Sequence, residues 1–481
     1  MKNLFLFFIA TTFGGHLSCF SQQWITQKYD YEVTEDVFFG TAIDFNGNTD
    51  SLKMDIYSPI CDDVTHTSRR PLLICIYGGG FIEGTRKDPS VVDNCINFAK
   101  RGYVTAAIDY RLGYVFDENP WDCSIENYSC FFATDTAEWA RAYYRGVQDG
   151  KGALRYLINR NEEWRIDADN VFVMGESAGA MVALGMGLLD TIAERPPATY
   201  AIPDAPAPNP LMYDCLPQTY SGESIERPDL GPIEGSIEPT ELDYTIKGIG
   251  NIFGAMFSDL LKNTTSEVKP VICSFHQPCD LLVPIDSTEI YWGLSWCMTH
   301  GYNCYGFANT PKVYGSRTMD IWNESNNYGY AIQSDFTSMN FPYDFWIGQA
   351  SCIDQGVNSG SQCHGYDNKS LRMNMMADHF VTAITTSPIC DTAMVLSVEK
   401  PDFIHFNIYP NPTKDRITLE GQYSGQLYFT LFNSVGKTLS RKSISFSDRE
   451  EIDLSNLPVG IYLLRLGNDK GFAKSVKVVK E

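Results

Sequence analysis

The sequence lacks any long apolar run after its first residues. No later stretch approaches the ~20 consecutive apolar residues that a membrane-spanning helix needs, so we expect no transmembrane segment. Positive charge is also scarce: 37 Lys and Arg stand against 59 Asp and Glu, and the formal net charge is −22. Because such an acidic surface repels phosphate backbones and anionic lipids, the composition argues against nucleic acid and anionic membranes as partners.

The spacings that mark metal and dinucleotide sites are missing as well. No CxxC pair and no CxxC/HxxxH arrangement is present, so the sequence predicts no zinc site. The G-x-G-x-x-G pattern of dinucleotide-binding folds is absent. We therefore expect neither a metal nor an organic cofactor.

Residues 1–22 have the features of an export signal. Lys2 provides a positive start, a short apolar run follows, and small and polar residues come before Gln22. Thirteen of the 14 cysteines follow this segment, and three sets lie close together: Cys123/Cys130, Cys297/Cys304 and Cys352/Cys363. In an exported chain these are better interpreted as disulfides than as metal ligands. Because thirteen is odd, one thiol stays free, and Cys75, inside an apolar run, is our candidate.

Strand and helix patterns alternate along residues 23–395. Apolar strands are expected at 72–77, 103–110 and 171–174, and further strands at 246–249 and 271–275. Helices are expected at 91–101, 137–161 and 178–192. Alternation at this spacing predicts a mostly parallel sheet with helices on both faces. Two inserts, near 196–239 (rich in proline and expected to be irregular) and 291–362, are expected to form cap or rim elements.

The strongest chemical signal is Gly175-Glu176-Ser177-Ala178-Gly179, directly after the expected strand 171–174. A serine on a sharp strand-to-helix turn needs small neighbours, and the helix N-terminus adds backbone N–H groups and a positive dipole beside it. The motif predicts Ser177 as a nucleophile.

A glycine-rich turn, Tyr77-Gly78-Gly79-Gly80-Phe81, ends an earlier strand about 100 residues before Ser177. Bare amides of consecutive glycines can converge on a developing oxyanion. We expect an oxyanion hole formed by the N–H groups of Gly79, Gly80 and Ala178.

Together these motifs resemble those of the carboxylesterase-like and hormone-sensitive-lipase-like α/β-hydrolases. The segments 109–113 (DYRLG) and 148–167 are also similar to that family. The resemblance covers roughly residues 30–390 and implies the α/β-hydrolase fold. It departs from the family at Tyr77, where the lipase-like group has histidine, and at 48–51, where the cholinesterase-type group has a Glu-Asp-Cys motif.

In this fold the acid and the base follow the nucleophile in the order acid, then histidine. Asp280 lies just past the expected strand 271–275, in a segment that resembles the family's acid loop. His364 and His379 compete for the base. His364 lies in a loop before an expected helix at 370–384, whereas His379 lies inside that helix. A base must reach the serine from a loop, so we favour His364, with His379 as the alternative. His276, which precedes the acid, is interpreted as a structural loop histidine.

The end of the chain differs in character. Residues 396–404 are predicted to be a linker, and 405–481 is mildly basic, with short alternating strands that predict a small immunoglobulin-like β-sandwich. Its opening run 406–413 (FNIYPNPT) and its late segment 460–465 (GIYLLR) resemble the C-terminal sorting domain (type A) of the type IX secretion system. This resemblance implies the type IX machinery as a partner and a secreted or cell-surface location.

The sequence thus predicts a secreted serine carboxylic-ester hydrolase that uses Ser177, His364 and Asp280. Small-molecule or polysaccharide esters are the expected substrates, on the basis of secretion and the acidic, aromatic-rich inserts. Two alternatives remain: a peptidase of the same fold, and a non-catalytic surface binding protein.

Overall fold

The computed structural model describes residues 23–60, 69–113, 136–208, 220–262, 268–291, 310–337, 363–385, 406–433, 438–467 and 473–481. The chain divides into two compact units, Met1–Asp391 and Thr392–Glu481. The expected signal segment 1–22 and the linker 396–404 lie outside the described residues. No helix in the described ranges is long and apolar enough to cross a membrane.

The first unit is built around an eight-stranded sheet with the order β1-β2-β4-β3-β5-β8-β10-β13. The strands β1 and β2 form an antiparallel hairpin that joins β4, and all the remaining neighbours pair in parallel. Strands β3 and β4 are buried along their whole length, as expected for parallel strands covered on both faces. The strands span Tyr31–Ile43 (β1), Thr49–Pro59 (β2), Arg70–Ile76 (β3), Val104–Ile108 (β4), Ile166–Glu176 (β5), Ile246–Ile252 (β8), Val271–Phe275 (β10) and Ile332–Asp335 (β13).

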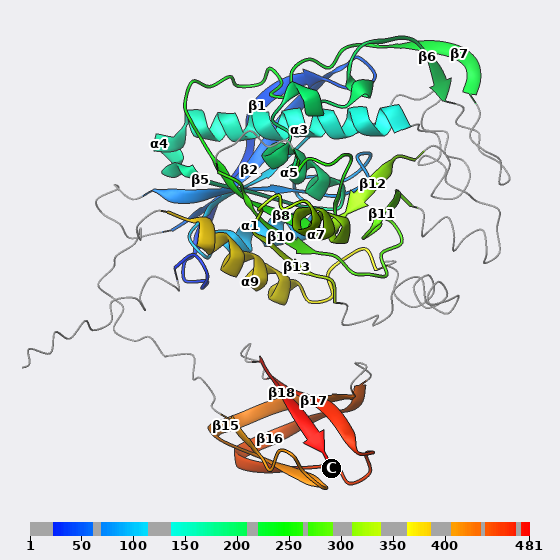
Figure 1. Cartoon of the computed structure of the whole chain (residues 1–481). Coiled ribbons are helices and arrows are strands. Elements are labelled where there is room, and N and C mark those ends of the chain that lie inside the picture. The colour runs from blue at the N-terminus through cyan, green and yellow to red at the C-terminus, as the bar shows by residue number, and fades with distance from the viewer. Residues whose placement is uncertain are drawn as a thin grey trace, which may run out of the picture. The chain divides into compact units, whose positions relative to one another are not determined.

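Helices cover both faces of this sheet, as the alternating pattern predicts. Helices α3 and α5 pack together on one face, and α9 lies on the opposite face and contacts α1 (Figure 1). The helices span Pro89–Ala99 (α1), Thr136–Asn159 (α3), Asn161–Trp164 (α4), Ala178–Leu188 (α5), Ser316–Ser325 (α7) and Lys369–Phe380 (α9). The expected helix 178–192 is too long by one turn. A capping box formed by Thr191 and Glu194 starts a separate 3₁₀ turn, Ile192–Glu194, and α5 ends before it.

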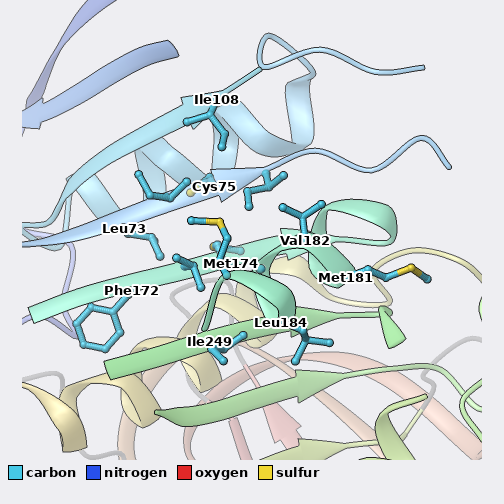
Figure 2. Packing of buried hydrophobic residues seen from close by; sticks show 14 of the residues in the cluster. Leu73, Cys75, Ile108, Phe172, Met174, Met181, Val182, Leu184 and Ile249 are labelled. Carbon is cyan, nitrogen blue, oxygen red and sulfur yellow. The ribbon is translucent and has the colours of Figure 1, made fainter. Parts of the chain in front are cut away.

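Buried side chains cover both faces of the central sheet. Figure 2 shows Leu73 and Cys75 of β3, Phe172 and Met174 of β5 and Ile249 of β8 together with Val182 and Leu184 of α5. All of these side chains are buried. Phe172 packs against Phe380 of α9, with the ring centres 4.7 Å apart, whereas Ile249 lies beside Gly187 of α5. Because each fully buried side chain of this size contributes about 1.5–3 kcal/mol, the two layers together hold β5 and the turn after it in place.

The two expected inserts are more regular than the sequence suggested. Within 196–239 the structure has a 3₁₀ turn at Pro197–Thr199 and an antiparallel pair, β6 (Ile202–Pro208) and β7 (Tyr220–Arg227). The prediction of irregular structure there was wrong, because a two-stranded ribbon has only edges and tolerates prolines that cannot donate to a ladder.

The second insert, expected at 291–362, includes part of the main sheet. Its middle contains β12 (Lys312–Gly315), α7 and β13, and β13 is the last strand of the main sheet. Strand β13 is short and pairs with β10 alone, so it lacks the apolar run that marks the central strands. Strand β12 joins β9 (Ala255–Met256) and β11 (Ser287–Glu289) in a small separate sheet. Residues 292–309 and 338–362 lie outside the described part of the chain.

The described part of the second unit is an antiparallel sheet of five strands, two of them long, with its own apolar core. Strand β15 pairs with β14, β16 and β17, and β17 pairs with β18. Strand β15 is longer than the short strands that the sequence predicts in this region, and it has a register shift between Glu420 and Ser424. The strands span Phe406–Tyr409 (β14), Arg416–Asn433 (β15), Thr438–Asp453 (β16), Gly460–Gly467 (β17) and Ala473–Lys480 (β18). This architecture agrees with the expected small β-sandwich.

Candidate active site

Ser177 occupies the turn between β5 and α5. Its backbone has φ 56° and ψ −122°, a strained conformation for a residue that carries a side chain. The turn is held at both ends: the Ser177 N–H donates to the carbonyl of Ile252 in β8, and its carbonyl accepts from the amides of Ala180 and Met181 in α5. The strand and the helix therefore force the strained serine into one orientation.

The two motif glycines permit this turn by sterics. A Cβ on Gly179 would lie 2.3 Å from the carbonyl oxygen of Tyr77, and one on Gly175 would lie 2.2 Å from the carbonyl oxygen of Gly179. Both contacts are with backbone, which cannot move aside. Because Gly179 has no side chain, the glycine-rich turn after β3 can lie directly against the turn of Ser177.

The structure brings Ser177, His364 and Asp280 together in one chain of hydrogen bonds. His364 Nε2 lies 2.7 Å from Ser177 Oγ, and its Nδ1 lies 2.8 Å from Asp280 Oδ2. Ser177 lies in the turn after β5, Asp280 in the loop after β10, and His364 in the loop before α9. Because a carboxylate can only accept, Nδ1 carries the proton of neutral His364, and the Nε2 lone pair faces the serine hydroxyl.

Asp280 is buried, and both of its carboxylate oxygens are hydrogen-bonded. Its Oδ1 accepts from the amides of Leu282 (2.8 Å) and Val283 (3.0 Å). Burial alone would raise the pKa of this carboxyl, but the charge of His364 and hydrogen bonds from His276 and His364 outweigh it, so the pKa is lowered. The carboxylate is therefore ionised at neutral pH.

His276, interpreted from the sequence as a structural loop histidine, contacts the acid directly. It is buried, and its Nε2 lies 3.2 Å from Asp280 Oδ2 and 3.0 Å from the carbonyl of Val283. Its Nδ1 lies 3.0 Å from Ser316 Oγ. Asp280 Oδ2 thus contacts two imidazoles, one facing Ser177 and one facing the interior. A signal was present in the i, i+4 spacing of His276 and Asp280, but nothing in the sequence shows that the loop turns the ring back onto the carboxylate.

The alternative base, His379, lies in α9 as expected. Its Nε2 hydrogen-bonds the carbonyl of Ala331 at 3.0 Å. Burial, set against that hydrogen bond, lowers the pKa of this imidazole. It is not part of the Ser177 chain of hydrogen bonds.

The glycine-rich turn and the serine line one cavity of about 600 Å³. Gly79 and Gly80 have φ values of 102° and 60°, which only glycine adopts without strain. The carbonyl of Gly79 accepts from the amides of Ile82 and Glu83, so its peptide is turned back on its own loop. Ala178, the third expected oxyanion donor, opens α5, and the first N–H groups of a helix have no partner within the helix.

The described wall of this cavity is largely apolar and aromatic. Phe253 packs edge-on against the His364 ring, with the ring centres 4.7 Å apart. Trp139 and Tyr291 form a second edge-on pair. The remaining apolar side chains of the wall are Phe81, Val91, Met181, Leu282, Val283 and Ile290. Its acidic members are Glu83, Asp88 and Glu176.

A buried polar cluster around Glu176, next to the nucleophile, was not anticipated. One carboxylate oxygen, Oε1, accepts from Ser90 Oγ (2.7 Å), Asn94 Nδ2 (2.7 Å) and Tyr366 OH (2.8 Å). Burial, together with the Glu176 charge, raises the pKa of Tyr366, which stays a proton donor at all ordinary pH values. The cluster joins the serine turn to the loop that carries His364. The sequence marks Glu176 only as the variable residue of its motif.

The cysteine pairing differs from the expected one. Cys363 is bonded to Cys279, 84 residues earlier, so the proposed Cys352/Cys363 pair was wrong. Short sequence separation misled, because the loops after β10 and before α9 meet in space. Cys75 is free and buried, as expected, and so are Cys95 and Cys273. The residues 123, 130, 297, 304 and 352 lie outside the described ranges.

Two family models match the chain. One, described as a secretion system C-terminal sorting domain, matches residues 407–481. The other, described as BD-FAE, matches residues 54–131 and 134–200, which include the glycine-rich turn and the Ser177 motif. The residues 280 and 364 lie outside both matched regions.

Similar proteins include the liver carboxylesterase B-1 of Rattus norvegicus, which is 32% identical over 130 residues, 27% of this chain and 19% of that protein. The non-reducing polyketide synthase mapC' of Penicillium brevicompactum is 25% identical over 221 residues, 45% of this chain and 9% of the synthase. The chain thus spans about a fifth of the carboxylesterase and less of the synthase. Among solved structures, Thermogutta terrifontis esterase 2 phosphorylated by paraoxon aligns with 63% of this chain and 81% of its own, at 15% identity and a TM-score of 0.33.

Proposed function

We propose that this chain, an α/β-hydrolase with a C-terminal sorting domain, is a serine carboxylic-ester hydrolase that acts after export. The observation that carries the proposal is the position of His364, within 2.7 Å of Ser177 Oγ and 2.8 Å of Asp280 Oδ2. Such a chain of contacts is what acyl transfer through a serine requires.

In the proposed cycle, Nε2 of neutral His364 takes the Ser177 proton as Oγ attacks the ester carbonyl. The ionised Asp280 holds the Nδ1–H tautomer and stabilises the imidazolium that forms. The amides of Gly79, Gly80 and Ala178 receive the oxyanion. His364 then protonates the leaving alcohol, and a water molecule repeats the sequence on the acyl-enzyme. Each step uses groups of the chain itself and water.

The cavity wall suggests the class of ester. Apolar and aromatic side chains favour a neutral acyl group, and Glu83 and Asp88 would repel an anionic one. We propose that neutral, short or medium acyl esters of small molecules or polysaccharides are hydrolysed, and that acids carrying a second carboxylate are poor substrates.

The test is hydrolysis of p-nitrophenyl acetate by the full chain and by two variants, Ser177→Ala and His364→Ala. We expect turnover by the unaltered chain and a loss of at least about 10³-fold in each variant, because removing one member disables the whole unit. Labelling with a fluorophosphonate should occur on the unaltered chain and not on Ser177→Ala. Turnover that survives in Ser177→Ala contradicts the assignment. A chain that cleaves peptides faster than esters would be a peptidase, and a folded chain that does neither would be a binding protein.

A further inference from the structure

The loops that carry Asp280 and His364 are joined beside the reacting groups by a disulfide. Cys279 directly precedes the acid, Cys363 directly precedes the base, and the two are bonded to each other. Both are buried. The disulfide thus links the neighbours of two residues that must stay within hydrogen-bond reach.

Gln277 adds a second link between the same loops. Its Nε2 donates to the carbonyls of Cys363 (3.2 Å) and Gly365 (2.8 Å), which are the residues on either side of His364. Gln277 is itself buried. One side chain of the acid loop therefore holds the backbone of the base loop before and after His364.

The base loop needs such support because its backbone is strained. Cys363 has φ 58°, in the left-handed region that a residue with a side chain rarely adopts. Strained conformations persist only where the surroundings over-determine them. The side chain of Cys363 is bonded to Cys279, and its carbonyl accepts a hydrogen bond from Gln277. Both of these supporting contacts come from the loop that carries Asp280.

We propose that the Cys279–Cys363 disulfide and Gln277 position His364 against Ser177, and that the hydrolase reaches its full activity only when this disulfide has formed. The inference rests on the ester-hydrolase function proposed above. Formation removes two electrons and two protons from the two thiols and transfers them to a disulfide-bearing oxidant, which leaves as a dithiol. Dithiothreitol reverses the step and itself becomes a cyclic disulfide.

The expected export route gives this dependence a consequence. Disulfides form in oxidising compartments and are rare in the reducing cytosol. The C-terminal region matches a sorting domain of a secretion system. A chain still in the cytosol would carry its acid and base on loops without the covalent link, so it would reach its full rate of hydrolysis only after export.

The test is the double variant Cys279→Ser/Cys363→Ser of the full chain, assayed with p-nitrophenyl acetate. A displacement of about 1 Å can cost about 10²-fold, so we expect kcat to fall by about 10² with KM unchanged. Fluorophosphonate labelling of Ser177 should slow in parallel. Reduction of the unaltered chain by dithiothreitol should lower kcat in the same way, and reoxidation should restore it, whereas the double variant should ignore both treatments.

The chain offers a matched control in Cys95→Ser/Cys273→Ser, which also replaces two buried sulfur atoms. Both thiols are free and buried, so each is shielded from a reductant or oxidant in solution. This control should keep the kcat of the unaltered chain. Gln277→Met, which leaves the disulfide intact, provides a second measurement if the double variant does not fold, with an expected fall in kcat of about tenfold at constant KM.

The outcomes separate the two proposals. A folded double variant with the kcat of the unaltered chain, or Gln277→Met with no change in kcat, overturns this inference alone. A change confined to KM also overturns it, because positioning of the base acts on the chemical step. An oxidised unaltered chain that hydrolyses no ester overturns the proposed function and this inference with it.

Discussion

Glu176 and Tyr366 offer a direct measure of how firmly the serine turn is bonded to the loop of the base. Glu176 accepts three hydrogen bonds through Oε1, one of them from Tyr366 OH at 2.8 Å. A hydrogen bond to a charged group contributes about 1.5–3 kcal/mol and a neutral one about 0.5–1.5 kcal/mol. Glu176→Gln weakens three such bonds, and part of this loss is offset because no charge remains to be buried.

From these contributions we expect Glu176→Gln to lower the free energy of unfolding by about 1–3 kcal/mol, and Tyr366→Phe by about 1.5–3 kcal/mol. The double variant should lose less than the sum of the two. The difference is the coupling between the two side chains, and we expect about 1–2 kcal/mol for a direct contact. We also expect Glu176→Gln to lower kcat by about tenfold, because Tyr366 lies two residues from His364.

The assay is urea unfolding of the full chain, followed by tryptophan fluorescence. All eight tryptophans precede residue 392, so the signal reports the first unit and not the C-terminal one. This separation matters, because a single free energy of unfolding is undefined for two units that unfold independently. A coupling below about 0.3 kcal/mol, the error of additivity itself, would show that the two residues do not act together.

Three other expectations can be checked on single variants. The pKa of Asp280 is lowered, so its charge stabilises the fold fully above the ordinary value of about 3.9, and this stabilisation is lost as the pH falls through the lower pKa of the folded protein. Melting temperatures from pH 3 to 7 should therefore show the gap between the unaltered chain and Asp280→Asn narrowing below about pH 4, and a gap that ignores pH would refute this. Gly179→Ala puts a Cβ 2.3 Å from a backbone carbonyl oxygen, so it should lower the free energy of unfolding by at least about 1–3 kcal/mol and abolish fluorophosphonate labelling. In the control Gly460→Ala the new Cβ meets nothing nearer than 3.9 Å, so this variant should melt like the unaltered chain. Lys480→Met removes an ammonium that donates to the carbonyls of residues 454, 455 and 457, and should destabilise the C-terminal unit by about 2 kcal/mol, seen as faster hydrogen exchange of β18 amides; unchanged exchange would count against it.

The parts of the fold that could be predicted are those that leave a local pattern. Buried strands such as β3 and β10 appear as short apolar runs, and the sequence predicts their limits to within two residues. The Ser177 turn is marked by glycines because a Cβ at Gly175 or Gly179 meets backbone. Strand β13 has no such mark, because it lies at the edge of the sheet with polar residues and one neighbour.

The contacts that hold the site depend on residues far apart in the sequence, and these could not be predicted. Glu176 and Tyr366 are 190 residues apart, and Gln277 lies 86 and 88 residues from the carbonyls that it binds. No spacing rule connects such positions. The Cys352/Cys363 prediction failed for the same reason, since nearness in sequence was the only available guide.

Topology explains why the candidate triad could nevertheless be proposed from the sequence. In a parallel sheet the carboxyl ends of neighbouring strands lie at the same edge, so the segments after β3, β5 and β10 must meet. Those segments contain the glycine-rich turn, Ser177 and Asp280. Among the described residues the strand that precedes His364 in sequence is β13, which ends at Asp335, so strand order alone cannot place His364. What brings His364 to that edge is its attachment to the acid loop through residues 277 and 279, so the position of the base depends on side-chain links rather than on the sheet.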